Sequence, residues 1–321
     1  MARRGSRSLA AVAAAMVLGA CHGEPTTRLR IGMNPWPGYA QLAVAVEAGL
    51  FAEHGIDAQI VEYASLHDLK RGFASGQIDV LPSTLVEVLE LHGSGFAPEV
   101  VWVLDCSRGG DVVVARGRAV DDLRGARIAY EAGTLGGFLL QRLCERRGLD
   151  QAEITPVTMS QEQMVREFAA GRIDAAISYP PHATAMRTEA GAAVVFSTRD
   201  LPGEVIDTVC IDRRLLDADA TLLGRFHGAM AATDRYCTTA HTAALRTMIR
   251  TTGMSEPEFV AALADIEIYH ADQQAAWLQQ PQRLRDLAAR IRRTTPSDAA
   301  LPDFVLTADR RSPLLHAAAP R

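Results

Sequence analysis

The chain has 321 residues, 48% of them hydrophobic, and a formal net charge of −5 at pH 7. A chain of this length can bury a large core and is expected to form two domains. The acidic balance and the lack of a long basic block argue against nucleic acid as a partner, and beyond the first 20 residues no apolar run is long enough to span a bilayer.

Residues 1–20 have the pattern of an export signal. Three arginines lie within the first seven positions, and the apolar run Leu9–Leu18 is about half as long as the roughly 20 residues that a membrane-spanning helix needs. Leu18-Gly19-Ala20-Cys21 is similar to the lipobox of bacterial lipoproteins, in which the cysteine is acylated. We therefore expect cleavage before Cys21, a lipid anchor on Cys21, a linker at 21–27 and a location on the periplasmic side of the cell envelope. An ordinary signal peptide with a chance cysteine is the alternative.

The other four cysteines indicate neither a redox motif nor a zinc site. Cys106, Cys144, Cys210 and Cys237 lack the spacing of either, and they are too few for a disulfide scaffold. One disulfide is conceivable in an oxidising compartment. Cys106 with Cys210 is the first pair to examine, because both lie at ends of expected strands.

Short apolar strands alternate with helices in residues 28–110. The sequence predicts strands at 28–33, 58–63, 80–82 and 100–104, and helices at 40–53, 66–75 and 85–92. This alternation is typical of a mostly parallel sheet that is covered by helices on both faces.

The same alternation follows a second time. Residues 111–115 are expected to cross to a second lobe, with strands at 127–130, 154–157, 175–178 and 193–196 and helices at 136–147 and 161–170. A strand at 204–211 is expected to return to the first sheet, 214–293 to be mostly helical, and 294–321 to form a tail. The prediction is therefore a discontinuous lobe I (28–110 and 206–293) and a lobe II (111–205).

An internal repeat supports two similar lobes. Phe73-Ala74-Ser75-Gly76-Gln77-Ile78-Asp79 recurs 95 positions later as Phe168-Ala169-Ala170-Gly171-Arg172-Ile173-Asp174. Each copy closes a helix, turns at a glycine and enters a short strand. Ligands of open α/β sheets bind beyond the carboxyl ends of the strands, so the expected site is a cleft between the lobes, and the two crossings form a hinge.

Four segments carry a family resemblance: Asn34-Pro35-Trp36-Pro37-Gly38-Tyr39, Glu47-Ala48-Gly49-Leu50-Phe51, Asp105-Cys106-Ser107-Arg108-Gly109-Gly110-Asp111 and Asp122-Leu123-Arg124-Gly125-Ala126-Arg127-Ile128-Ala129. With the lipobox and the repeat, they resemble type II solute-binding proteins of ABC importers, in the group that binds sulfonates, taurine, nitrate or thiamine-pyrimidine precursors. The resemblance implies a two-lobed α/β fold, with two mixed, mostly parallel sheets flanked by helices. It also implies a small-molecule ligand, a membrane permease as partner and a monomeric protein.

Loops at the expected cleft provide the first candidates for ligand contact. Asn34, Trp36, Gly38 and Tyr39 follow the first strand, in a loop that two prolines stiffen, and an aromatic ring there could cover a flat, apolar or cationic ligand. Packing of Trp36 on its own lobe is the alternative. Ser83 and Thr84 follow a strand and precede a helix, where a hydroxyl either caps the helix or contacts the ligand. Asp105 and Ser107 follow the next strand, where Asp105 could instead form a turn.

The second lobe and the return strand provide the remaining candidates. Thr134 and Gly136 begin a helix whose free N–H groups would attract an anion. Tyr179, followed by two prolines, lies in the place equivalent to Pro82-Ser83-Thr84 of the first copy. Asp207 lies among apolar residues and needs a partner, either backbone donors, an arginine or the ligand. With Asp105 and Glu131 it predicts an acidic cleft, and a zwitterionic or amine-bearing ligand would reconcile this with the anion expected at the helix.

The sequence motifs give little support for a catalytic function. His-Glu-x-x-His and Gly-x-Ser-x-Gly are absent and the nine histidines are scattered, so no catalytic residue, metal or cofactor is predicted. Two rivals stay open. The first is an enzyme of the pyrimidine-precursor or menaquinone-pathway type on the same fold, although the cysteine-rich iron motif of the former has no counterpart here and both types work in the cytoplasm. The second is a ligand sensor for a membrane kinase.

Overall fold

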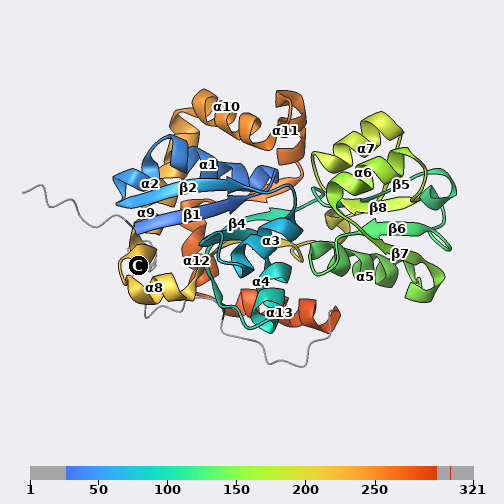
Figure 1. The fold of residues 1–321 in the computed structure, drawn as a ribbon, viewed down its shortest axis with the longest axis horizontal. Helices are drawn as coiled ribbons and strands as arrows, with labels where there is room; N and C mark the ends of the chain where they lie inside the picture. Colours follow the sequence, from blue (N-terminus) through green and yellow to red (C-terminus); the bar gives the residue numbers. More distant parts are fainter. Residues whose placement is uncertain (1–26, 295–303, 305–321) are drawn as a thin grey trace, which may run out of the picture.

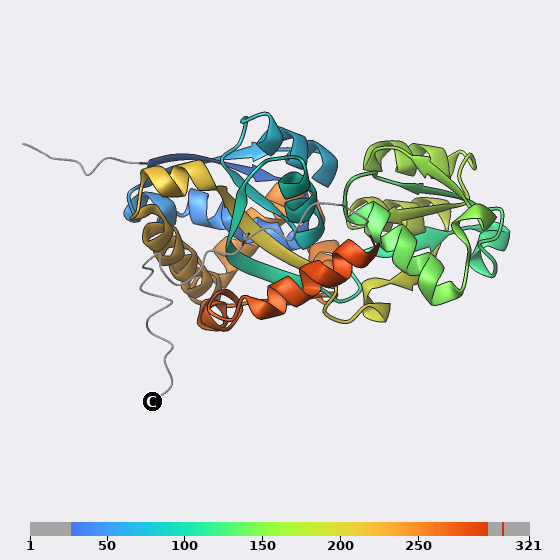
Figure 2. The same cartoon turned by 90° about the horizontal axis from the view of Figure 1, so that it is seen from below.

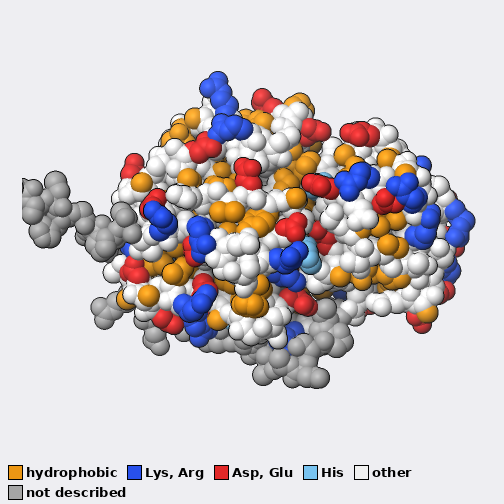
Figure 3. All heavy atoms as spheres, in the orientation of Figure 1, with side chains coloured by type: hydrophobic (Ala, Val, Ile, Leu, Met, Phe, Trp, Pro, Cys, Tyr) orange, Lys and Arg blue, Asp and Glu red, His pale blue; other side chains and the backbone are white. Residues whose placement is uncertain are grey.

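The computed structural model describes residues 27–294 and Phe304. The expected signal segment, Cys21, nearly all of the linker and the tail beyond residue 294 lie outside these residues. The described chain forms two lobes side by side, each built on one β-sheet (Figure 1). None of the helices in this part of the chain has the length and apolar character that crossing a bilayer requires. On the face in Figure 3, acidic and basic side chains are interspersed, with no continuous basic patch.

The sheet of the larger lobe has six strands in the order β11-β4-β10-β3-β1-β2. They are β1 (Thr27–Met33), β2 (Ile56–Glu62), β3 (Val80–Thr84), β4 (Pro98–Ser107), β10 (Ile206–Asp212) and β11 (Ile266–Ile268). β1 pairs in parallel with β2 and β3, whereas β10 runs antiparallel to β3 and β4, and β11 runs antiparallel to β4. The chain leaves this sheet after β4 and returns to it as β10.

The smaller lobe has a five-stranded sheet in the order β7-β6-β8-β5-β9. Its strands are β5 (Val112–Ala115), β6 (Arg127–Tyr130), β7 (Thr155–Thr158), β8 (Ala175–Ser178) and β9 (Ala193–Ser197). β6 is parallel to β7 and β8, and β5 is antiparallel to β8 and β9. Both sheets are mixed, as expected. Parallel pairs do not predominate, because the strands that follow the two crossings, β5 and β10, run against their neighbours.

Helices cover both faces of the sheets (Figure 1). They are α1 (Ala40–Glu47), α2 (Leu50–Glu53), α3 (Leu66–Ala74), α4 (Leu85–Gly93), α5 (Leu135–Arg147), α6 (Gln161–Ala169), α7 (His182–Ala190), α8 (Arg213–Ala218), α9 (Leu222–Thr239), α10 (His241–Thr252), α11 (Glu256–Leu263), α12 (Gln274–Leu278) and α13 (Gln282–Thr294). In the smaller lobe, alternate residues of β5 pack to opposite sides. Val114 joins Phe168 of α6 in one cluster, and Val113 joins Phe138 of α5 in the other.

Three segments differ from the sequence-based expectation. The helix expected at 40–53 is two helices, because Gly49 adopts a left-handed conformation (φ 73°) that ends α1 and begins α2. The crossing expected at 111–115 is itself a strand, β5, in the second sheet. Residues 214–293, expected to be mostly helical, also contain the three-residue strand β11, which adds an edge to the first sheet.

Cys106 and Cys210 do not form a disulfide, and the four cysteines in the described residues are free. Both lie on paired strands, but Cys106 is opposite Ile206 and Cys210 is opposite Val100. Four residues along a strand cover about 13 Å, whereas a disulfide needs Cα atoms within about 7 Å.

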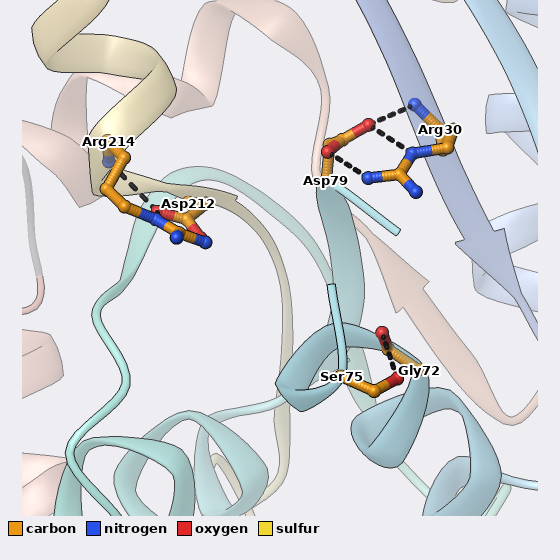
Figure 4. A network of polar contacts seen from close by, with 6 residues as sticks. All are labelled: Arg30, Gly72, Ser75, Asp79, Asp212 and Arg214. Atoms are coloured by element: carbon orange, nitrogen blue, oxygen red, sulfur yellow. Dashed lines mark hydrogen bonds and ion pairs between the residues drawn. The ribbon is translucent and has the colours of Figure 1, made fainter. Parts of the chain in front are cut away.

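The sequence repeat corresponds to an ion pair that recurs in both lobes. In the larger lobe, Asp79 accepts hydrogen bonds from the backbone N–H of Arg30 and from two nitrogens of its guanidinium group, at 2.7–2.9 Å (Figure 4). In the smaller lobe, Asp174 makes the same three bonds with Arg127, at 2.8–3.1 Å. Each bond set ties the loop after a helix to a strand of its sheet, β1 in the larger lobe and β6 in the smaller lobe. We call these pairs the Arg–Asp clasps.

Helix α13 joins the two lobes on the side opposite β2. It packs against α4 of the larger lobe and α5 of the smaller lobe. In Figure 2 it runs from beneath the larger lobe toward the smaller one. The lobes are therefore connected by this helix as well as by the two crossings, which lie between β4 and β5 and between β9 and β10.

Candidate functional site

Two adjoining cavities lie between the lobes. The first has about 230 Å³ of space between atoms, part of it open to solvent, and is lined by Asn34, Trp36, Tyr39, Leu66, Thr84, Asp111, Leu135, Tyr179 and Asp207. The second has about 260 Å³ by the same measure, shares Leu66, Asp111, Leu135 and Tyr179 with the first, and adds smaller-lobe residues including Glu131, Thr134, Gly136, Gln161 and Ser178. Both are narrow, with room for about one water molecule each, so a solute needs the lobes to separate. We call the two cavities together the cleft. Larger hollows of about 790 and 1180 Å³ open elsewhere, and of the predicted ligand-binding residues they include Gly38 alone.

Most of the predicted ligand-binding residues line the cleft. The structure brings together Asn34, Trp36, Tyr39, Thr84, Thr134, Gly136, Tyr179 and Asp207. Four others lie behind it: Gly38, Ser83, Asp105 and Ser107. The Ser107 hydroxyl is 2.8 Å from that of Thr198 and accepts a hydrogen bond from the Asp111 backbone, so Ser107 connects the two crossings. Ser83 is fully buried, and Thr84 both caps α4 and lines the cleft.

An aromatic ring from each lobe meets in the cleft. Trp36 and Tyr179 form an edge-to-face contact with ring centroids 6.1 Å apart. The indole lies against Gly110, where a Cβ atom would come within 2.5 Å of the ring, so the crossing needs glycine at this position. The Tyr179 hydroxyl accepts hydrogen bonds from the Asn34 side chain and the Leu66 backbone, both at 3.3 Å. Trp36 therefore contacts the other lobe rather than packing only on its own.

Two aspartates lie opposite each other behind the Trp36 loop. Asp105 on β4 pairs in register with Asp207 on β10. Trp36 Nε1 donates to Asp105 at 3.3 Å, and the Tyr39 hydroxyl donates to Asp207. Burial raises the pKa of Asp105 to about 7, against the lowering effect of the Trp36 bond. Burial also raises the pKa of Asp207 well above its usual range, and the charges of Asp105 and of Asp111 raise it further.

Glu87 is a residue behind the cleft that the sequence analysis missed. It is fully buried on α4 of the larger lobe, and its Oε1 accepts a hydrogen bond of 2.6 Å from the backbone N–H of Leu135, the first residue of α5 in the smaller lobe. Thr84 donates to its other oxygen at 2.5 Å. Burial raises the pKa of Glu87 to about 7, and these hydrogen bonds lower it. The helix end that was expected to attract an anionic ligand is therefore already bound to a carboxylate of the chain.

A second group of polar side chains lies in the smaller-lobe part of the cleft. Gln161 donates to Glu131 at 3.2 Å and accepts from Ser178 at 2.7 Å. Burial raises the pKa of Glu131. Gln161, Ser178 and Asp111 were not predicted as site residues. Burial raises the pKa of Asp111 to about 7.

Comparison of the sequence with known proteins identifies the family of the chain. The family model for the NMT1-like family matches residues 22–251, more than half of the chain. A Brucella abortus protein described as a binding protein is 29% identical over 143 residues, which are 43% of each chain. A Saccharomyces cerevisiae 4-amino-5-hydroxymethyl-2-methylpyrimidine phosphate synthase is 25% identical over 152 residues, which are 46% of this chain and 44% of the yeast enzyme. The chain thus matches less than half the length of these relatives.

Solved structures share the fold over most of the chain. The alkanesulfonate-binding protein SsuA of Xanthomonas axonopodis superimposes with a TM-score of 0.72 at 21% identity, covering 88% of this chain and 99% of SsuA. The nitrate-binding protein NrtA of Synechocystis superimposes with a TM-score of 0.60 at 11% identity, covering 84% and 89%. At these identities the structural likeness shows the periplasmic binding protein fold alone. The match to the family model shows the family: the chain belongs to the NMT1-like family.

Proposed function

We propose that this protein is the substrate-binding component of an ABC importer, which captures a small organic solute between its lobes and delivers it to a membrane permease. The observation that carries the proposal is the cleft itself. Its polar and aromatic side chains come from both lobes and lie beyond the carboxyl ends of strands such as β1, β3 and β6. This is where ligands bind in open α/β sheets.

In this proposal the two lobes move as units. Residues 28–110 with 206–293 form one unit and residues 111–205 the other, with the two crossings as the hinge. Contacts across the cleft would then form as it closes: Asn34 with Tyr179, Glu87 with Leu135, and the Lys70 ammonium group with the carbonyl oxygen of Gly133. X-ray scattering should show a smaller radius of gyration at saturating ligand, and identical curves would contradict closure.

We further propose that the mature protein is held to the membrane by lipid on Cys21, facing the periplasm. Several acyl chains would anchor it stably, whereas one would not. Membrane fractionation of cells that express the wild type or Cys21→Ala tests this. The variant should be recovered in the soluble fraction, and its retention in the membrane fraction would contradict the lipid anchor.

An enzyme related to the yeast synthases is the second candidate, and their sequence similarity favours it. Recovery of the bound molecule distinguishes the two functions. A receptor releases its solute chemically unchanged, so mass spectrometry after incubation and denaturation should return the added compound alone. Formation of 4-amino-5-hydroxymethyl-2-methylpyrimidine phosphate, or of any other product, would support the enzyme.

The test of the main proposal is a thermal-shift screen of the purified, lipid-free protein. The panel contains sulfonates, taurine, nitrate, amino acids, polyamines, pyrimidines and aromatic acids. A ligand at 100 times its dissociation constant should stabilise the fold by about 2.7 kcal/mol, a rise in Tm of about 4 °C for a protein of this size. Trp36→Ala is the matched variant and should lose the response. No response to any compound would count against the receptor.

A further inference from the structure

The polar atoms of the cleft define a chemical class of ligand. On the basis of the proposed receptor function, we propose that the cleft selects a small organic cation whose N–H groups bind the buried carboxyl groups, and that Glu87 excludes anions such as sulfonates and nitrate from the start of α5. The inference rests on three observations, which concern the helix end, the unpaired oxygens and the uncompensated acidic groups.

The start of α5 has no free place for an anion. A helix N-terminus attracts negative charge through its unpaired N–H groups and its dipole. Here Leu135 donates to Glu87, and Gly136 donates to the Thr134 hydroxyl at 3.2 Å. An anionic ligand would have to displace the Glu87 carboxylate or lie beside it. The two negative charges would repel each other strongly in this buried position.

The cleft presents hydrogen-bond acceptors that lack donors. The side-chain oxygen of Asn34, a residue only 4% exposed, makes no hydrogen bond within the described residues, although its amide nitrogen donates to Tyr179. One oxygen each of Asp111 and Glu131 is likewise buried without a well-formed hydrogen bond, although Ser107 and Ser65 lie close enough to lower the pKa of the respective carboxyl group. The second oxygen of Asp207 is also buried, and Asp207 interacts with Asp105. Buried polar atoms normally have partners, so incompletely bonded acceptors around one cavity favour a ligand with several donors. A protonated amine offers three N–H groups, and an amidinium group offers more.

The same cavities contain no basic side chain. Of the described residues that line them, none is Lys, Arg or His, whereas Asp111, Glu131 and Asp207 all contribute carboxyl groups. Asp105 and Glu87 lie directly behind them. Lys70, the single lysine of the chain, donates to the carbonyl oxygen of Gly133, and its charge acts on Glu87 behind the cavities. A bound cation would compensate the carboxyl groups that line the cavities and favour their charged forms.

The aromatic pair and the ligand geometry favour an organic cation over a metal ion. Trp36 and Tyr179 present ring surfaces at the cleft, and such rings attract ammonium and amidinium groups. Within the described residues, no group of three or more His, Cys, Asp or Glu side chains is arranged to hold a metal ion. The ligand class is therefore a compact amine or amidine with a flat or apolar part.

The experiment compares two probes with the same ring and opposite charge, benzamidine and benzenesulfonate. Both are titrated by isothermal calorimetry into the wild type, Glu87→Ala and the control Glu90→Ala, whose side chain is half-buried on the same helix. We expect the wild type to bind benzamidine at least about tenfold more tightly than benzenesulfonate, and Glu87→Ala to narrow this ratio by about tenfold, because removal of the carboxylate frees the end of α5. Glu90→Ala should behave as wild type.

The outcomes separate this inference from the proposed function. Tighter binding of benzenesulfonate by the wild type would overturn the cation selectivity, and an unchanged ratio in Glu87→Ala would overturn the role of Glu87. If a neutral or anionic solute gives a thermal shift and neither benzamidine nor the polyamines do, the receptor function stands and the selectivity for cations is rejected. No thermal shift with any of the solutes would reject both the receptor function and the cation selectivity. If Glu87→Ala does not fold, Glu87→Gln keeps an oxygen acceptor for Leu135 and removes only the charge.

Discussion

The two lobes share their scaffold and differ at the cleft. The Arg–Asp clasps make the same three bonds in each lobe and tie the residue before β3 to β1 and the residue before β8 to β6. At the carboxyl ends the lobes diverge. The larger lobe contributes the carboxyl groups of Glu87, Asp105 and Asp207 and the Trp36 ring. The smaller lobe contributes those of Asp111 and Glu131, the neutral Gln161 and Ser178, and the start of α5. The repeated part of the chain maintains the fold, and the part that varies between the lobes sets the chemistry of the cleft.

The largest effect expected from this difference is on the pH dependence of stability without ligand. Burial raises the folded-state pKa values of Glu87, Asp105 and Asp111 to about 7. The folded protein therefore holds protons that the unfolded chain releases near pH 4. The corresponding stabilisation is complete below about pH 4 and is lost as the pH rises through 7, on the order of 3 kcal/mol for each group before coupling between them. Tm should fall between about pH 6.5 and pH 8, where the histidines of the unfolded chain are mostly neutral.

Three histidines act against this trend below about pH 6.5, because burial lowers the pKa of His92, of His182 and of His227, the last to about 4. Their contribution to stability rises with pH up to about 6.5 and is constant above it. Two carboxylates with lowered pKa values do not titrate in this window. The pKa of Asp219 is lowered to about 2 by hydrogen bonds that outweigh its burial, and the ion pair with Arg127 lowers that of Asp174. Their contributions are lost only at lower pH. Asp105→Asn should flatten the slope of Tm against pH, and the half-buried Glu90→Gln should leave it unchanged. A Tm that rises from about pH 6.5 to pH 8 would show that the cleft carboxyl groups are stabilised as anions.

The next effect tests the shared scaffold. Asp79→Asn should lower the free energy of unfolding by about 2 kcal/mol, because it breaks a bidentate ion pair and a bond to the backbone. Asp174→Asn should cost about 1 kcal/mol, since its side chain is 34% exposed against 18% for Asp79 and solvent screens the pair. Urea denaturation measures both. The exposed Arg28–Asp57 pair provides the control Asp57→Asn, which should change little. A larger loss in the free energy of unfolding for Asp174→Asn than for Asp79→Asn would contradict the expectation that the less exposed pair is the stronger one.

A smaller effect is expected where the lobes meet. Tyr179→Phe keeps the ring contact with Trp36 and removes the hydroxyl that accepts from Asn34 and Leu66. Loss of these bonds should weaken binding of a confirmed ligand by about fivefold, which corresponds to about 1 kcal/mol. Calorimetry on this variant and on Tyr130→Phe, in the same lobe but outside the cleft, makes the comparison. Equal affinities for Tyr179→Phe and the wild type would show that the hydroxyl contributes nothing to the closed form.

Local signals in the sequence were enough to predict the order of strands and helices and most of the aromatic and polar cleft residues. Trp36 and Tyr179 follow strands directly, so parallel strand direction alone brings them to the cleft. The break at Gly49 and the strand β11 were missed, because one glycine is tolerated in a helical pattern and three residues carry no periodicity. The position of Cys106 relative to Cys210 depends on strand register, which the pattern of apolar residues left open.

Glu87 could not be predicted for a different reason. Thr84-x-x-Glu87 has the spacing of a capping box, which would direct the carboxylate to the start of its own helix. One oxygen does bind the Thr84 hydroxyl at the start of its own helix, but the other binds Leu135, 48 residues away and in the other lobe. That second contact depends on how the two lobes face each other, and no local pattern contains this information. The helix start at Thr134 and Gly136, where the sequence led us to expect an anionic ligand, is bound by a carboxyl group of the chain.

The smallest effect concerns the edge of the cleft, where Lys70, the single lysine of the chain, donates to the carbonyl oxygen of Gly133. Exposed contacts of this kind contribute about 0.2–1 kcal/mol, so Lys70→Met should weaken ligand binding by at most about fivefold. Arg71→Met, exposed on the same helix, is the control. The amine also reports closure directly, because its reaction with an acylating reagent should slow when ligand brings Gly133 against it. Equal labelling rates with and without saturating ligand would mean that Lys70 contacts the smaller lobe in both states. The lobes would then have to separate at another part of the cleft.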